Sequence, residues 1–489
     1  MNFDKSVSLS LIVKRLTQLQ DHIVKEIDMA DSGSLDPSSF KRLSPSRFIS
    51  FSFPNPSQGP YSDVLRIAVL DSPLLPSLPP PKVAAMLVPI GRESDWIFCT
   101  AAGHLQLPPH LLLPGPVLSR LIFHWKNFQI FSCPPMSYTR PQSEPDLCSL
   151  QHFQEALFPL LLALCPKAAF KNGVPEIPFL SYEDNVVRSV LVDRIEGPVS
   201  GEMLVEDVEI DVSPVPELRR RLRFKMMPNL VQTQVRLIPD PSKDGTIGPQ
   251  KGSLVQPYLA PMVAGLSLVA PFLEEKIKLG LRPRALCLGV GGGTLPMFLK
   301  SKLDFDILGV EADPVVLNIA RQHFGLVEGE FLHVHIGDAI GFIKNVAQQE
   351  DTLRRGLERM SDLVEGSRID FDVIMVDLDA GDAVNGASAP PSEFVQRSVL
   401  LAAKMVLHDR GIIVINVIPQ SKAFYSELIH DFREVFAELY EIEVGNGENY
   451  VLVATVTNVQ LSRSGSCGSW LQKLKLVIGE KHMNSINKI

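Results

Sequence analysis

The chain has 489 residues, which is too long for one hydrophobic core and predicts two or three domains. Its composition, 45% hydrophobic and 21% charged, is typical of a globular protein that folds without disulfides or metals. The formal net charge of -8 gives no general basic field, so it argues against affinity for nucleic-acid phosphates and suits a basic substrate better.

The six cysteines are widely scattered and form no Cys-x-x-Cys pair, which predicts a reduced protein without a metal site. The N-terminal residues contain charges and no unbroken apolar run, so no secretory signal is expected. The most apolar short run, 157–165, is interrupted by Pro159 and is too short to span a bilayer. We therefore expect a soluble, cytoplasmic protein that binds neither nucleic acid nor membrane.

The N-terminal half has an irregular organisation. Apolar residues recur at helical spacing over 1–30, and Pro- and Ser-rich segments follow, so 1–80 predicts a helix and linker-like loops. From 81 to 238 the pattern changes to short strands and turns, which predicts a smaller strand-rich domain. Composition predicts a linker over 239–252 and a C-terminal tail over 461–489.

Between 253 and 460 strands and helices alternate. The expected strands span 285–290, 306–311, 331–336, 371–376, 411–417, 439–445 and 450–456. The expected helices span 294–302, 314–324, 339–347, 393–406 and 421–436. Continuous apolar strands imply a doubly wound parallel sheet covered on both faces, and the last two strands must form an antiparallel hairpin. The predicted fold class is therefore α/β, with a Rossmann-like sheet of the class I methyltransferase type after the smaller strand-rich domain.

The central motif of this domain is a glycine-rich loop after its first strand. Gly289, Gly291 and Gly293 stand where a buried strand turns into a helix, and glycines allow a sharp turn and close approach of a ligand. Glu311 follows Gly291 by about the twenty residues expected for an acid that binds ribose hydroxyls. The alternative explanation of the glycines alone is a tight structural turn.

Acids after the third and fourth strands narrow the choice of cofactor. Asp338, followed by Ala339, is placed to accept from the exocyclic amine of adenine, a group that dinucleotide enzymes do not regularly require there. Asp377 and Asp379 follow the fourth strand at the crevice where the strand order reverses. The set predicts an S-adenosyl-L-methionine site, and the alternative is a set of helix caps and turns. Its cofactor-binding members are Gly289, Gly291, Gly293, Glu311, Asp338, Ala339 and Asp377.

These residues resemble the spermidine-synthase-like branch of class I methyltransferases. The sequence is similar in particular to the C-terminal half of the methyltransferases that modify eukaryotic translation elongation factor one alpha. The similarity extends to 87–98, 229–236, 262–266 and the loop after Asp379. In that family the C-terminal domain modifies the substrate's N-terminal α-amine, so the resemblance implies a protein substrate, elongation factor one alpha. Lysine methylation is not implied, because no glycine loop with a matching acid precedes Leu254.

For methyl transfer to an amine, Asp377 and Asp379 are the predicted catalytic residues, because carboxylates can orient an ammonium and accept its proton. A solvated acidic loop is the alternative interpretation. Two other functions stay open: a spermidine-synthase-like aminopropyltransferase and a non-catalytic Rossmann scaffold. Thr294 argues against the former, since it replaces an Asp that spermidine synthases use on the decarboxylated cofactor. The basic run of Arg219, Arg220, Arg221, Arg223 and Lys225 is expected to be a solvated strand edge, and the alternative is a surface for an acidic partner. The sequence leaves the oligomeric state unknown.

Overall fold

The structure is a computed structural model that describes most of residues 186–489 and the backbone of six strands before them. The described ranges are 186–212, 215–225, 230–239, 247–357, 370–379, 389–419, 422–444, 449–459 and 468–489, with backbone alone for 350–357. The helix predicted over 1–30 lies outside the described residues. In the described ranges no helix is both long and apolar enough to cross a bilayer.

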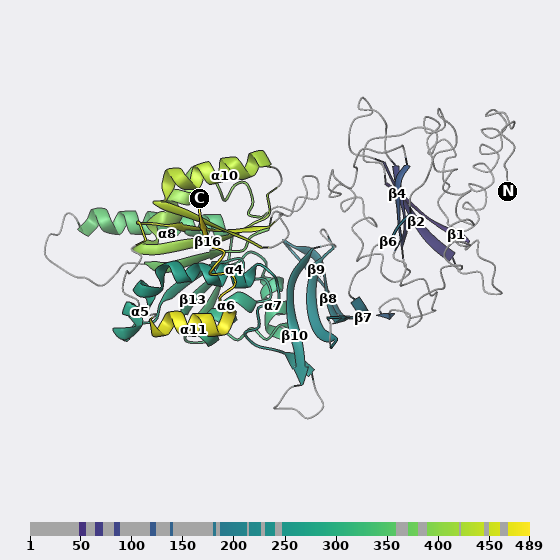
Figure 1. Cartoon of the computed structure of the whole chain (residues 1–489), viewed down its shortest axis with the longest axis horizontal. Helices are drawn as coiled ribbons and strands as arrows, with labels where there is room; N and C mark the ends of the chain where they lie inside the picture. Colours follow the sequence, from purple (N-terminus) through teal and green to yellow (C-terminus); the bar gives the residue numbers. More distant parts are fainter. Residues whose placement is uncertain are drawn as a thin grey trace. The chain divides into compact units, whose positions relative to one another are not determined.

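The chain divides into two compact units, the first mainly residues 1–191 and the second mainly residues 192–489. The first unit contains a five-stranded sheet in the order β1-β2-β3-β4-β6 (Figure 1). Its strands are β1 (Phe48–Pro54), β2 (Val64–Asp71), β3 (Val83–Val88), β4 (Leu118–Phe123) and β6 (Phe179–Ser181). β1 and β2 lie in the part of the sequence where we expected a helix and loops. The segment FISFSFP of β1 alternates apolar and small polar residues, a strand pattern that the neighbouring Pro and Ser residues obscure.

A second sheet has the order β11-β10-β9-β8-β7-β5, and the division between the units runs through β7 and β8. Its strands are β5 (Ser137–Thr139), β7 (Val186–Gly197), β8 (Gly201–Ile210), β9 (Glu217–Phe224), β10 (Val231–Pro239) and β11 (Ile247–Pro249). In the second unit its apolar face packs against helix α7 (Pro314–His323), with Leu222 and Val235 meeting Ile319. β11 lies within 239–252, which composition predicted to be a linker.

The main sheet confirms the predicted fold class. Its order is β14-β13-β12-β15-β16-β18-β17-β19, and the strands from β14 to β16 are parallel. The strands are β12 (Arg284–Leu288), β13 (Asp306–Glu311), β14 (Leu332–Ile336), β15 (Phe371–Val376), β16 (Leu407–Val417), β17 (Glu438–Glu443), β18 (Tyr450–Thr455) and β19 (Asn487–Lys488). β18 runs antiparallel to both β16 and β17, as the predicted hairpin requires.

Helices cover both faces of this sheet (Figure 1). One face packs against α4 (Leu259–Ala264), the 3-10 turn η6 (Gly265–Val269), α5 (Ala270–Lys278), α6 (Thr294–Leu303) and α11 (Ser469–Ile478). The other packs against α8 (Ala339–Leu357), α9 (Arg397–Met405) and α10 (Lys422–Val435). Alternate side chains of β15 enter the two cores, Met375 on the α6 face and Val376 on the α9 face, which explains its unbroken apolar sequence. The carboxyl ends of the parallel strands then meet at one edge.

The C-terminal segment packs on the same unit. Trp470 and Leu474 of α11 are buried in the core beside α4 and α5, and Glu274 accepts the Ser469 N–H at 3.2 Å. β19 then pairs antiparallel with β17, and the Ile489 N–H donates to the carbonyl of Leu439 at 3.0 Å. This segment therefore covers the edge strand β17, which would otherwise have unpaired backbone groups.

Candidate functional site

The glycine-rich loop connects β12 to α6, and two of its glycines show why the sequence needs them. Gly289 has φ 81, and a Cβ there would lie 2.0 Å from the carbonyl oxygen of Asp377, so only glycine allows β12 and the end of β15 to approach. Gly291 has φ 51, and a Cβ there would meet only the Thr233 hydroxyl at 3.6 Å. The backbone at Gly291 is therefore open on the side where a ligand would approach.

Glu311, at the end of β13, bonds directly to this loop. Its Oε2 accepts the N–H groups of Val290 at 3.2 Å and Gly291 at 3.1 Å, and its Oε1 accepts that of Asp313 at 3.1 Å. Burial raises the pKa of Glu311, and these backbone bonds oppose that rise. These backbone N–H groups hold the Glu311 carboxylate at the end of β13, against the glycine-rich loop.

Asp338 and Ala339 follow β14 at the same edge of the sheet, since Ile336 pairs with Glu311. Asp338 is exposed, and its Oδ2 accepts the Gly341 N–H at 2.6 Å in the first turn of α8. Ala339 is buried at the start of that helix. The structure thus gives Asp338 a helix-capping contact, and binding of adenine by this pair stays a prediction.

Asp377 follows β15 and lies beside the loop, because its N–H donates to the carbonyl of Leu288 at 2.9 Å. Its Oδ2 accepts from the Tyr258 hydroxyl at 2.9 Å, and its Oδ1 accepts from Asn416 Nδ2 at 3.2 Å. Loss of water contact raises the pKa of Asp377 to about 6, although both hydrogen bonds favour the ionised form. Asp377 is therefore a carboxylate held from two sides that can take up a proton near neutral pH.

Asp379, the second predicted acid, follows Asp377 by two residues and is exposed to solvent. Desolvation by the surrounding protein, and then the charge of Asp377, raise the pKa of Asp379 to about 7, while a hydrogen bond donated by the Gln232 side chain opposes the rise. Both acids therefore have pKa values near neutrality, about 6 for Asp377 and about 7 for Asp379.

Strand β10 contributes the part of the site that the sequence analysis missed. The Thr233 hydroxyl accepts the Gly292 N–H at 3.2 Å, so the second sheet bonds to the glycine loop. Gln256 Nε2 donates to the backbone carbonyls of Val231 at 3.1 Å and Gln232 at 3.0 Å, which fixes the start of β10 beside the acids. Tyr258 and Asn416 were missed as well. For Asn416 a signal existed, because it is the polar residue in the apolar run IIVINV of β16.

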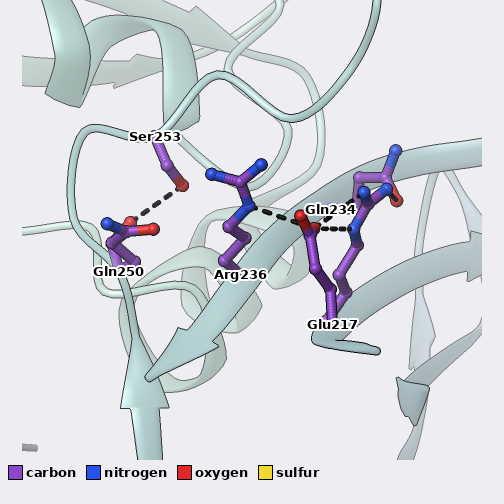
Figure 2. Close-up of polar contacts among 6 residues, drawn as sticks. Glu217, Gln234, Arg236, Gln250 and Ser253 are labelled. Atoms are coloured by element: carbon purple, nitrogen blue, oxygen red, sulfur yellow. Dashed lines mark hydrogen bonds and ion pairs between the residues drawn. The ribbon is translucent and has the colours of Figure 1, made fainter. Parts of the chain in front are cut away.

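The basic run 219–223 corrects one expectation. β9 lies between β10 and β8, so it is not a strand edge. Figure 2 shows Glu217 beside Arg236, whose Nε lies 3.0 Å from Glu217 Oε2. Arg219 lies 2.9 Å from the same oxygen. Arg220 forms an ion pair with Asp207 at 2.6 Å, and its side chain is only 16% exposed. These arginines are paired within the sheet, so the expectation of a solvated edge is wrong.

The fold and this edge define an α/β protein with a class I methyltransferase type sheet and a glycine-loop ligand site. In the described ranges no three His, Cys, Asp or Glu side chains gather as a metal site would require. The candidate site consists of backbone amides of the glycine-rich loop, the acids Glu311, Asp338, Asp377 and Asp379, and the polar groups around them.

No family model matches the chain. It resembles the protein named eEF1A lysine and N-terminal methyltransferase from Homo sapiens, with 28% identity over 416 residues, which cover 78% of this chain and 52% of that relative. The chain thus spans about half the length of the curated relatives it matches. A polyamine aminopropyltransferase of Vibrio vulnificus is 30% identical over 217 residues, which cover 43% of this chain and 60% of the relative. Among solved structures, human methyltransferase-like protein 13 in complex with SAH is 25% identical, covers 47% of this chain and 93% of its own, and has a TM-score of 0.36.

Proposed function

We propose that the protein is an S-adenosylmethionine-dependent methyltransferase that acts on a protein amine, the N-terminal α-amine of elongation factor 1-alpha. The observation that carries this proposal is the position of Asp377: it lies beside the glycine loop, held by Tyr258 and Asn416, with a pKa of about 6. Such a group can bind an amine and accept its proton at the point where a cofactor methyl would be delivered. The resemblance to the eEF1A methyltransferases supports the choice of acceptor.

The residues present fit S-adenosylmethionine. The open backbone at Gly291 and the buried carboxylate of Glu311 provide an amide loop and an acceptor for ribose hydroxyls. Thr294 is buried at the start of α6, so no carboxylate stands there to repel the carboxylate of the methionine group. When bound, this cofactor supplies a methyl group activated by a sulfonium.

The chain's own residues then handle the acceptor. Asp377 and Asp379 bind the incoming ammonium, and the ionised carboxylate removes one proton to leave a neutral amine. The bound cofactor would supply the methyl group, and the carboxylate that remains ionised would stabilise the positive charge on the methylated nitrogen. A second proton leaves the methylated nitrogen for a carboxylate and then for water. Tyr258 and Asn416 hold the Asp377 carboxylate in place during these steps.

A second candidate is aminopropyl transfer to a polyamine, favoured by the 30% identity to the Vibrio vulnificus enzyme. In both reactions an amine attacks a carbon atom bound to sulfur, so the two acids are compatible with either reaction. Thr294 favours methyl transfer, as argued above.

The test uses the purified protein, labelled S-adenosylmethionine and purified elongation factor 1-alpha, with mass spectrometry of the acceptor. Label on the N-terminal peptide is the expected result. Label on lysine alone, or no label when the protein binds the cofactor, contradicts the proposed acceptor. Asp377→Asn is the matched control, because it keeps size and shape while removing the carboxylate.

A further inference from the structure

Asp313 lies two residues after Glu311 and bonds to it through the backbone. The Asp313 N–H donates to Glu311 Oε1 at 3.1 Å. The side chain of Asp313 is fully buried, and its Oδ1 accepts the Val315 N–H at 2.9 Å, so Asp313 is the N-cap of α7. Helix capping uses only one carboxylate oxygen, which leaves Oδ2 for another contact.

The second oxygen binds the turn between β7 and β8. Asp313 Oδ2 accepts the Val199 N–H at 3.0 Å and the Ser200 N–H at 2.8 Å, although these residues precede it by 114 and 113 positions. At Gly197 a Cβ would lie 2.4 Å from the same oxygen, so only glycine allows this close approach. One end of the second sheet is therefore fixed beside the carboxyl end of β13, where Glu311 lies.

Asp313 binds more groups than helix capping requires, because a neutral Ser or Asn caps a helix about as well as Asp does. Burial alone would raise the pKa of Asp313, but the bonds from Ser200, Val315 and Val199 outweigh it and hold the pKa below its ordinary value. The carboxylate is therefore ionised at neutral pH and accepts backbone N–H groups from two segments far apart in the sequence. It stabilises the position of the turn as well as the start of α7.

We infer that Asp313 is a positioning residue of the cofactor site: its carboxylate joins the β7–β8 turn to the start of α7 and its N–H holds Glu311, so that the second sheet determines where the Glu311 carboxylate lies. This inference rests on the proposed function, because it takes Glu311 as the acceptor for the ribose hydroxyls. The same sheet contacts the glycine loop through Thr233. The second sheet therefore supports both the loop and the ribose acid.

This coupling acts in both directions. If the turn holds Glu311 in position for a ribose, a ribose bound by Glu311 must stabilise the turn by the same free energy. The N–H groups of Val199 and Ser200 exchange with solvent only when their bonds to Asp313 open. A bound cofactor should therefore slow that exchange.

Hydrogen–deuterium exchange of the wild-type protein tests the inference without any substitution. We expect saturating S-adenosylhomocysteine to slow exchange at Val199 and Ser200 by roughly 10-fold, within the usual range of coupling between sites. The N–H groups of Leu279 and Gly280 are the control, because they end α5 at the opposite edge of the main sheet and should change by less than about twofold. Unchanged exchange at the turn, or equal slowing at both places, overturns the inference.

Asp313→Asn tests the side chain itself. Asn keeps the size and can cap α7, but its single oxygen cannot also accept from Val199 and Ser200. We expect the Kd of S-adenosylhomocysteine, measured by calorimetry, to rise by roughly 10-fold, the order of one lost hydrogen bond to a charged group. With the acceptor protein, KM for S-adenosylmethionine should rise while kcat stays nearly constant. Loss of a helix cap alone would produce neither change, because Asn retains the cap.

Asp207→Asn is the matched control. Asp207 binds Arg220 at 2.6 Å, and Arg220 donates to the carbonyl of His323 at 3.3 Å, so this pair joins the same sheet to the other end of α7. Its affinity for S-adenosylhomocysteine should stay within about twofold of wild type. Equal weakening by both substitutions, or unchanged affinity in Asp313→Asn, overturns the inference alone. Failure of the wild type to bind S-adenosylhomocysteine contradicts the proposed function and the inference with it.

Discussion

The carboxylate of Asp377 is held on both oxygens, by Tyr258 on one and by Asn416 on the other. Asp377→Asn keeps the size but removes the negative charge and the proton acceptor. We expect turnover to fall by roughly 10²-fold or more, within the range for acid–base groups. Affinity for S-adenosylhomocysteine, measured by calorimetry, should fall much less than turnover. Full activity in this variant would remove Asp377 from the chemistry.

The acid pair also predicts a pH dependence. Both pKa values are raised, so the carboxylates are protonated at low pH and the rate should rise as pH increases through 6 and 7. Asp379→Asn removes the higher of the two ionisations, at about 7, and leaves Asp377 at about 6. The acidic limb of kcat/KM should therefore move down by about one pH unit. An unmoved limb would show that the profile reports the substrate amine instead.

Residue by residue, the sequence predicted the parts of the site that follow strand ends, because the ends of parallel strands meet at one edge. The loop glycines, Glu311 and the two aspartates were found in this way. Gln232, Tyr258 and Asn416 were not. Their closeness to Asp377 and Asp379 depends on how β10 and α4 pack onto the sheet, and no local pattern encodes that packing.

Among the elements, the contact of β10 with the glycine loop predicts a role for the second sheet in ligand binding. Thr233→Val keeps the shape of the side chain but leaves the Gly292 N–H without its acceptor. We expect S-adenosylhomocysteine to bind about 10-fold more weakly, which corresponds to about 1.4 kcal/mol. Calorimetry measures the change.

Thr455→Val is its control, since Thr455 is 2% exposed on β18 and its hydroxyl has no partner in the described structure. Affinity in the control should stay within twofold of wild type. Equal weakening by both substitutions would mean that the effect is general to the fold.

The periodicity of the sequence predicted the strands of the main sheet well, because buried parallel strands are continuous apolar runs. The periodicity did not predict α11 and β19. The helix is stabilised by packing against α5 and the strand by pairing with β17, and both partners lie far away in the sequence. The helix expected over 393–406 is shorter in the structure. It spans Arg397–Met405, and turns precede it at 392–395.

At the scale of the whole molecule, the two candidate reactions differ in the cofactor. The protein should use S-adenosylmethionine and should not form spermidine from putrescine and the decarboxylated cofactor. The physical reason is Thr294, which provides no carboxylate for the amine of the decarboxylated form. Thin-layer or mass analysis of the products distinguishes the two. Formation of spermidine at a useful rate would show that the protein transfers an aminopropyl group and would contradict the proposed methyl transfer.

The strand order of the main sheet also constrains how the chain acquires its structure during synthesis. β12 lies between β13 and β15, and β15 begins roughly 80 residues after β12 ends, whereas β13 follows almost at once. At about 5–20 residues per second, one side of β12 therefore waits ~4–16 s for its partner strand. During that interval an apolar strand with unpaired backbone groups is open to association with other nascent chains. Slow translation before Phe371 should increase aggregation, and chaperone binding to that intermediate should suppress it.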